Sequence, residues 1–188
     1  TITGKVKYVW LGASSDFKAD SDKSKFDLAR KLKKRIRKIR ENNDENLHSD
    51  DETTRQIATA LYFIDRLALR VGNEKGKDEA DTVGVTSLRV EHVSLLGKGL
   101  ISLDCLGKDS IRYQNKVKVD TIVYTNLEDF IKGKDKSKNL FDKISSCDMN
   151  KYLQEYMKDL TAKVFRTYNA SLLFQKELNK ITNKYEDK

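Results

Sequence analysis

The sequence predicts a mainly helical α+β fold in which helices surround a small three-stranded antiparallel sheet. Segments with apolar residues at helical spacing occupy both ends of the chain. Between them lie three short runs of partly alternating polarity, separated by turns that contain glycine, at residues 87–95, 99–106 and 110–119. The order helices, strands, helices is typical of the α+β class.

The first predicted helix, at residues 26–40, is basic outside its apolar stripe. Residues 18–40 contain eleven Lys and Arg and three Asp side chains, so this segment carries the whole net charge of +8. Such a face favours a polyanion, and nucleic acid gains affinity by releasing counterions. A membrane or an acidic protein would use the same residues, and a solvated face is the simplest alternative. The stripe of this helix comprises Phe26, Ala29, Leu32, Ile36 and Ile39.

The polar residues 41–53 predict a loop without regular structure. A second helix is expected over residues 53–72, with Ile57, Leu61 and Ile64 on one face. Because Gly72 is placed to end this helix, Arg70 is expected in its last turn.

The second predicted turn of the sheet contains Lys108. Residues 126–133 predict a short helix and residues 132–138 a solvated loop, and two more helices are expected to begin near Asp148 and Thr161. The buried stripe of the last helix is expected to comprise Val164, Phe165, Tyr168, Leu172 and Leu178.

The pattern of cysteines and histidines predicts no metal and no cofactor. Cys105 and Cys147 lie far apart without C-x-x-C spacing, and His48 and His92, the second in an expected strand, do not form a metal-binding pair. No run of eighteen apolar residues and no secretory leader is visible in the sequence. The GKDS segment at Gly107 lacks the earlier glycine of a phosphate-binding loop.

Three stretches differ from generic helix or hairpin sequence. They are LALRVGNEK at residue 67 with ADTVG at residue 80, LGKDSIRY at residue 106, and LTAKVFRTYNAS at residue 160. In sequence, order and spacing they resemble the eukaryotic-type type IB DNA topoisomerases, and the similarity runs from KYVWL at Lys7 through the final helix. The resemblance implies the catalytic core fold that these enzymes share with tyrosine recombinases.

By this resemblance, Arg70 and Arg166 match the two catalytic arginines of the family, and Lys108 matches its catalytic lysine. Guanidinium groups can donate paired hydrogen bonds to the charged oxygens of a phosphorus under attack, and a lysine can protonate the departing 5′ oxygen. Further DNA contacts implied by the resemblance are Lys7, Tyr8, Lys18, Lys25, Asn73, Asp109, Ser110, Lys163 and Thr167.

Each of the three residues alone has an ordinary structural explanation. Arg70 would compensate the dipole at a helix end, Lys108 would be an exposed turn residue, and Arg166 would be an ion-pair partner beside the buried Phe165. Only the ordered set of motifs favours catalysis over these alternatives.

The resemblance also predicts the domain organisation. Residues 1–15 are expected to close a preceding core subdomain, and residues 16–188 to form an incomplete catalytic subdomain that stops before the catalytic histidine and the nucleophilic tyrosine. His48 and His92 match no catalytic motif, Tyr168 is expected in the core, and Tyr185 lacks the long linker that precedes the nucleophile of the family.

The expected parent protein is a nuclear enzyme that relaxes supercoiled DNA without ATP or metal, through a transient single-strand break and a 3′-phosphotyrosyl bond. Its expected partners are double-stranded DNA and the remaining topoisomerase core and C-terminal domain. The alternatives are a noncatalytic DNA-binding module, the large subunit of a split enzyme, and a tyrosine recombinase.

Overall fold

The computed structural model describes residue 12 and residues 15–72 and 81–186. The helices are α1 (Asp16–Lys33), α2 (Ile36–Asn46), α3 (Glu52–Arg66), α4 (Thr121–Ile131), α5 (Ser146–Tyr156) and α6 (Ala162–Glu186). The strands are β1 (Val93–Leu95), β2 (Leu100–Leu106) and β3 (Arg112–Lys118). These described elements confirm a mainly helical α+β chain with one small sheet.

The sheet is antiparallel with the order β1-β2-β3, as predicted. Val93 lies opposite Leu103, and Cys105 lies opposite Tyr113, so the register is that of two successive hairpins. The alternation of β2 buries Ile101 and Leu103 against the helices. The turn between β2 and β3 holds residues 107–111 and projects from one end of the sheet.

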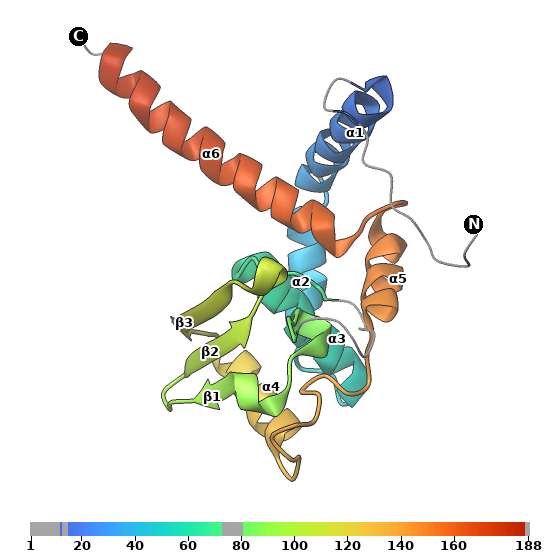
Figure 1. Ribbon diagram of the computed structural model, residues 1–188, viewed down its shortest axis with the longest axis vertical. Coiled ribbons are helices and arrows are strands. Elements are labelled where there is room, and N and C mark those ends of the chain that lie inside the picture. Colours follow the sequence, from blue (N-terminus) through green and yellow to red (C-terminus); the bar gives the residue numbers. More distant parts are fainter. Residues whose placement is uncertain (1–11, 13–14, 73–80, 187–188) are drawn as a thin grey trace.

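The helices form two groups that are visible in Figure 1. The sheet, α3 and α4 form the lower body, while α6 projects away from it past α1, against which it packs. The core is centred on α3, which packs against α2, α4 and α6, and its largest buried side chains include Phe63, Phe130, Phe141 and Phe165. In the part of the chain that is described, no helix has the length and apolar content needed to cross a membrane.

The basic segment predicted as one helix is two helices. Between them, Arg35 donates its backbone N–H to the Leu32 carbonyl at 2.8 Å, a bond three residues back that tightens the turn and ends the α-helical pattern. Ala29, Leu32, Ile36 and Ile39 are buried as expected, but Phe26 is 43% exposed because it precedes the packed part of the stripe.

The loop expected at residues 41–53 is much shorter, because α2 continues through Asn46. Asn43 explains this extension: its side chain is buried and donates to the Ala58 carbonyl at 3.1 Å, which holds the polar end of α2 on α3. Asp51 then caps α3 by accepting the Thr54 N–H at 2.7 Å.

Three further expectations are corrected by the structure. The α3 helix ends at Arg66, six residues before Gly72, because Ala68 turns into a left-handed conformation at a φ of 55°. His92 lies in a short 3-10 turn and not in a strand. Leu178 is 42% exposed, because α6 has by then left the core, whereas Tyr168 is buried as expected.

Candidate functional site

The three sequence motifs meet around one cavity of about 390 Å³. Four segments line it: the residues that follow α3, residues 83–88, the turn between β2 and β3, and the first turns of α6. Arg70, Lys108 and Arg166 all line this cavity. Residues up to 96 positions apart in the sequence are therefore gathered at one place, as the resemblance implied.

Arg70 lies outside the helix in which it was expected. It belongs to the extended segment after α3, where its carbonyl accepts the Val85 N–H at 2.8 Å. Val83 lies two residues before Val85, and its N–H donates to the Leu106 carbonyl at 2.7 Å. The segment around Gly84 thus holds the Arg70 backbone on one side and the end of β2 on the other.

The turn that carries Lys108 has an unusual backbone. Asp109 and Ser110 both adopt left-handed conformations, with φ values of 62° and 57°. Two successive non-glycine residues in this region are uncommon, and such strain gathers at functional sites. The Gly107 N–H donates to the Ile111 carbonyl at 2.8 Å and closes the turn. Lys108 is presented at its tip with an exposed side chain.

Arg70 and Arg166 line the same cavity, and among the described residues neither has a counter-ion. Burial, and then the positive charge of Arg70, lower the pKa of Arg166. The Arg166 Nε atom is buried and has no hydrogen-bond partner in the described part of the chain. A buried donor without an acceptor is costly, as is the approach of two like charges. An anion placed between the two guanidinium groups would offset their repulsion.

Six other arginines in the described residues form ion pairs, whereas Arg35 and Arg66 do not. Bidentate or close ion pairs join Arg40 to Asp65, Arg89 to Asp81 and Arg112 to Asp104, each with a shortest distance of 2.6–2.7 Å. By contrast, neither Arg70 nor Arg166 forms an ion pair within the part of the chain that the structure describes. The cavity therefore holds two guanidinium groups that are available for a ligand.

The expected DNA contacts fall into three groups. Asp109 and Ser110 lie in the Lys108 turn beside the cavity, where Asp109 is a lining residue. Lys18, Lys25 and Lys163 converge on Asp22, whose pKa is lowered chiefly by the hydrogen bond from Lys25 at 2.7 Å, with weaker effects of the other two lysines. This convergence places the basic α1 beside the start of α6.

Thr167 lies one residue after Arg166 and is half-buried, with its hydroxyl 3.5 Å from the Lys163 carbonyl. Lys7, Tyr8 and Asn73 lie outside the described residues, so their expected DNA contacts stay predictions.

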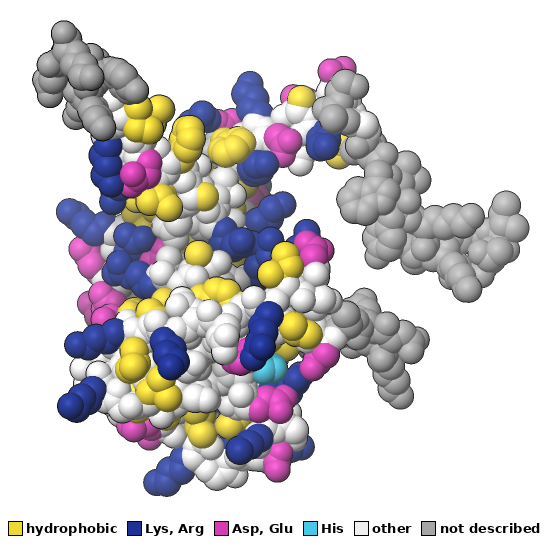
Figure 2. Space-filling model, turned by 60° about the vertical axis from the view of Figure 1, so that its left-hand side comes forward, with side chains coloured by type: hydrophobic (Ala, Val, Ile, Leu, Met, Phe, Trp, Pro, Cys, Tyr) yellow, Lys and Arg dark blue, Asp and Glu magenta, His cyan; other side chains and the backbone are white. Residues whose placement is uncertain are grey.

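Lys and Arg side chains are spread widely over the face shown in Figure 2, especially over its helical part. Hydrophobic side chains are also exposed there near the far end of the projecting helix. In the part of the chain that the structure covers, no cluster of three His, Cys, Asp or Glu side chains has the arrangement of a metal site.

Two features of the site were missed in the sequence. Arg112 and Cys105 also line the cavity, which the strand alternation could have indicated because both flank the Lys108 turn. Asp65 forms a buried ion pair with Arg40. Its position on the apolar face of α3, one turn after Leu61, was the available signal.

Comparison with known proteins identifies the family of the chain that carries this cavity. The sequence model of the family described as "Eukaryotic DNA topoisomerase I, catalytic core" matches residues 14–188. The chain belongs to this family. Full-chain comparisons agree: the chain is 49% identical to human DNA topoisomerase 1 over 187 residues, 47% to that of Caenorhabditis elegans over 196 residues, and 51% to that of Candidozyma auris over 183 residues.

These alignments cover 96–97% of the chain but only 24% of each topoisomerase. The chain therefore spans about a quarter of the length of the curated family members it matches. The cavity with Arg70, Lys108 and Arg166 lies within the part that they share, since the family match includes all three positions.

Proposed function

We propose that the protein relaxes supercoiled DNA by cutting and resealing one strand, and that this chain supplies three of the catalytic residues. The observation that carries the proposal is a cavity that contains Lys108 together with Arg70 and Arg166, two guanidinium groups that form no ion pair among the described residues. Family membership supports the same activity, because the named relatives are DNA topoisomerases.

The two arginines would act on the phosphodiester under attack. When a tyrosine oxygen adds to the phosphorus, negative charge grows on the two nonbridging oxygens. Planar guanidinium groups can donate paired hydrogen bonds to these oxygens, and they need no reorganisation if they are already in place. They would supply positive charge that a metal ion supplies in other phosphoryl-transfer enzymes.

Lys108 would act on the leaving group. The P–O5′ bond breaks as the tyrosine–phosphorus bond forms, and the departing oxygen takes a proton from the lysine ammonium. The exposed tip of the turn suits this role because a side chain there can reach into a bound duplex. The phosphotyrosyl bond keeps the energy of the broken linkage, so attack by the free 5′ hydroxyl reseals the strand without ATP.

The nucleophilic tyrosine and the further histidine of the mechanism would come from the rest of the topoisomerase core and C-terminal domain. Residues 16–188 would form one wall of a clamp around double-stranded DNA, with residues 1–15 belonging to the neighbouring subdomain. The basic side chains of Lys18, Lys25 and Lys163 would contact the DNA backbone. We propose the tyrosine recombinase and type IB core fold for this wall, and a nuclear location for the enzyme.

Relaxation of supercoiled plasmid by the full-length gene product, with chelator present and ATP absent, tests the proposal. Lys108→Ala should slow single-turnover cleavage by about 100-fold to 10,000-fold. Arg166→Ala should slow it by about 100-fold to 1,000-fold. The matched control is Lys98→Ala, since Lys98 is also an exposed lysine in a hairpin turn of the sheet.

Equal cleavage rates in the Lys108 and Lys98 variants would reject the assigned chemistry. A full-length protein that binds DNA but never relaxes it would instead favour a split enzyme, whose tyrosine lies on another subunit, or a recombinase. Addition of the separately expressed tyrosine-bearing subunit would then restore relaxation only in the split case.

A further inference from the structure

A single buried carboxylate joins three helices next to the cavity. Asp65, near the end of α3, has a side chain that is 5% exposed. Its two oxygens accept hydrogen bonds from Arg40 of α2, from Nε at 2.7 Å and from Nη2 at 2.9 Å. The Asn169 amide of α6 donates to the same carboxylate at 3.0 Å and to the Asp65 carbonyl at 2.8 Å.

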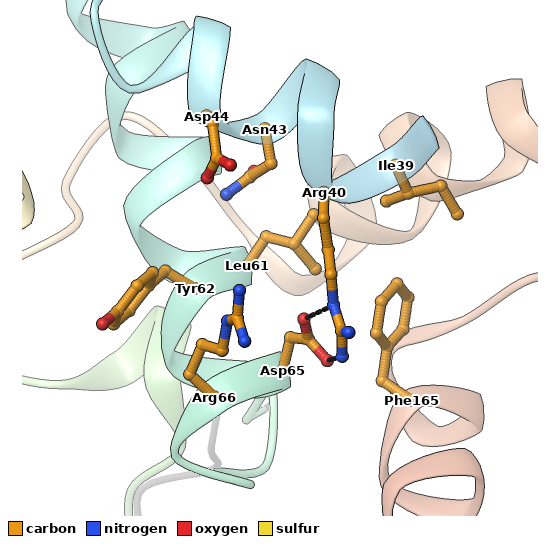
Figure 3. Close-up of a pocket in the computed structure, with 9 residues that line it drawn as sticks. All are labelled: Ile39, Arg40, Asn43, Asp44, Leu61, Tyr62, Asp65, Arg66 and Phe165. Carbon is orange, nitrogen blue, oxygen red and sulfur yellow. Dashed lines mark hydrogen bonds and ion pairs between the residues drawn. The ribbon is translucent and has the colours of Figure 1, made fainter. Parts of the chain in front are cut away.

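Figure 3 shows this ion pair with Phe165 of α6 beside it. The space enclosed among these side chains is only about 10 Å³, which is too small for any ligand larger than one water molecule. The cluster is therefore a closed joint between helices and does not form a second binding site.

Two residues of the joint are close in the sequence to the arginines of the cavity. Asn169 follows Arg166 by three residues on α6, so both lie on neighbouring turns of one helix. Asp65 precedes Arg70 by five residues, just before the chain leaves α3. The height and rotation of α6 relative to the end of α3 thus depend on the contacts of Asp65.

Contacts that hold α6 in place are needed because Arg70 and Arg166 repel each other. Before an anion binds, no carboxylate among the described residues forms an ion pair with either guanidinium group, and α6 would lower the repulsion by moving away. Buried ion pairs add little net stability compared with apolar packing, so the Arg40–Asp65 pair is better explained by the geometry that it fixes.

We propose that Asp65 is a positioning residue, which through Arg40 and Asn169 sets the place of Arg166 opposite Arg70. The inference rests on the proposed function, since it assigns a residue to the same catalytic site. Asp65 touches no reacting atom and acts only through the helices. Misplacement of a catalytic group by about 1 Å can cost about 100-fold in rate, so the effect on cleavage should be large.

The test uses the full-length protein and single-turnover cleavage of a short duplex, together with DNA affinity and the melting temperature. Asp65→Asn should slow cleavage by about 10-fold to 100-fold while DNA affinity changes less than about two-fold. Asn169→Ala is the milder variant, because it leaves the Arg40–Asp65 pair intact and releases only α6. The matched control is Asp142→Asn, which breaks the 2.6 Å ion pair with Lys134 away from the cavity and should leave cleavage unchanged.

Two double variants separate positioning from general damage to the fold. If Asp65 acts through Arg166, then Asp65→Asn should cause no further loss when Arg166→Ala is already present. The same change should keep its full effect in a Lys108→Ala background. If Asp65 had only a structural role, Asp65→Asn would slow cleavage equally in the Arg166→Ala and Lys108→Ala backgrounds.

Normal cleavage by Asp65→Asn and Asn169→Ala, beside slow cleavage by Arg166→Ala, would overturn the positioning role and leave the proposed function intact. An undiminished loss in the Arg166→Ala background would also overturn it. Wild-type cleavage rates in both Arg166→Ala and Lys108→Ala would instead reject the proposed function and the positioning role together.

Discussion

Gly84 packs against the backbone of Gly72 so closely that neither residue has room for a side chain. A Cβ atom on Gly84 would lie 2.2 Å from the Gly72 nitrogen, 2.3 Å from its Cα and 2.8 Å from the Arg70 carbonyl oxygen. Gly72 also needs its glycine identity because its φ is 87°. This contact holds the ADTVG segment against the segment that carries Arg70.

Gly84→Ala should therefore destabilise the fold and loosen Arg70. The obstructing atoms are backbone, which cannot move away cheaply, so we expect a loss of at least about 1–3 kcal/mol in the free energy of unfolding. Urea unfolding of the 188-residue chain measures this loss. Gly12→Ala is the control, because no atom of the described residues lies within 4 Å of a Cβ there. Equal stability of the two variants would show that the close packing is not required.

Phe63→Ala tests the core that supports the site. Phe63 is fully buried and meets Phe141 edge to face, with ring centroids 6.1 Å apart and an interplanar angle of 89°. Its truncation should lower the free energy of unfolding by about 3–5 kcal/mol. Phe174→Ala, at a residue that is 70% exposed, should change it by less than about 0.5 kcal/mol. Chemical denaturation of both variants gives the comparison, and similar small losses would contradict the assigned core.

Charge reversal of Lys31, Lys34 and Lys38 to Glu should weaken DNA binding far more than cleavage. These lysines border one hollow beside Met157, away from the Lys108 turn, so they can contribute charge without touching the reacting phosphate. Each lost phosphate contact should reduce the slope of log affinity against log salt by about 0.9. Binding titrations of the full-length protein at several salt concentrations measure this slope.

Lys136→Glu, in the exposed loop after α4, is the matched charge control for that experiment. Cleavage of saturated DNA should keep its rate in the triple variant. A loss of cleavage at saturation with an unchanged salt slope would show that the basic segment acts in catalysis and not in binding.

His92 should make stability depend on pH. Its Nδ1 accepts the Arg89 backbone N–H at 3.0 Å, and its pKa is lowered by burial and then by the Arg89 charge. Since the unfolded histidine has a pKa near about 6.5, the unfolded state binds more protons just below that pH. The contribution of neutral His92 to the free energy of unfolding is therefore complete above pH ~6.5. It is lost as the pH falls toward the pKa of His92 in the folded state.

Urea unfolding between pH 5 and pH 7.5 should show this loss in the wild type and a smaller one in His92→Gln. His48→Gln, at an exposed position, serves as the control and should keep the wild-type dependence. An identical pH dependence in all three proteins would mean that His92 is not the group responsible.

Much of the architecture could be predicted because it depends on local patterns. The apolar stripes of Ala29 to Ile39 and of Val164 to Tyr168 indicated buried helix faces, and alternation with glycine turns indicated the hairpins. The helix ends were predicted less well. Arg70 was expected inside α3, but the left-handed Ala68 ends the helix early. An alanine does not indicate a left-handed conformation, because it usually favours a helix.

The sequence by itself determined the class of fold, the basic segment and the three motifs that indicate the topoisomerase I family. Only the tertiary structure decided that Arg70 and Arg166 share a cavity in which no described residue acts as their counter-ion, and that Asp65 joins α2, α3 and α6. The reason is physical. Periodicity reports which face of an element is buried, whereas the pairing of a charge depends on which distant residues the packed elements bring within about 3 Å of it.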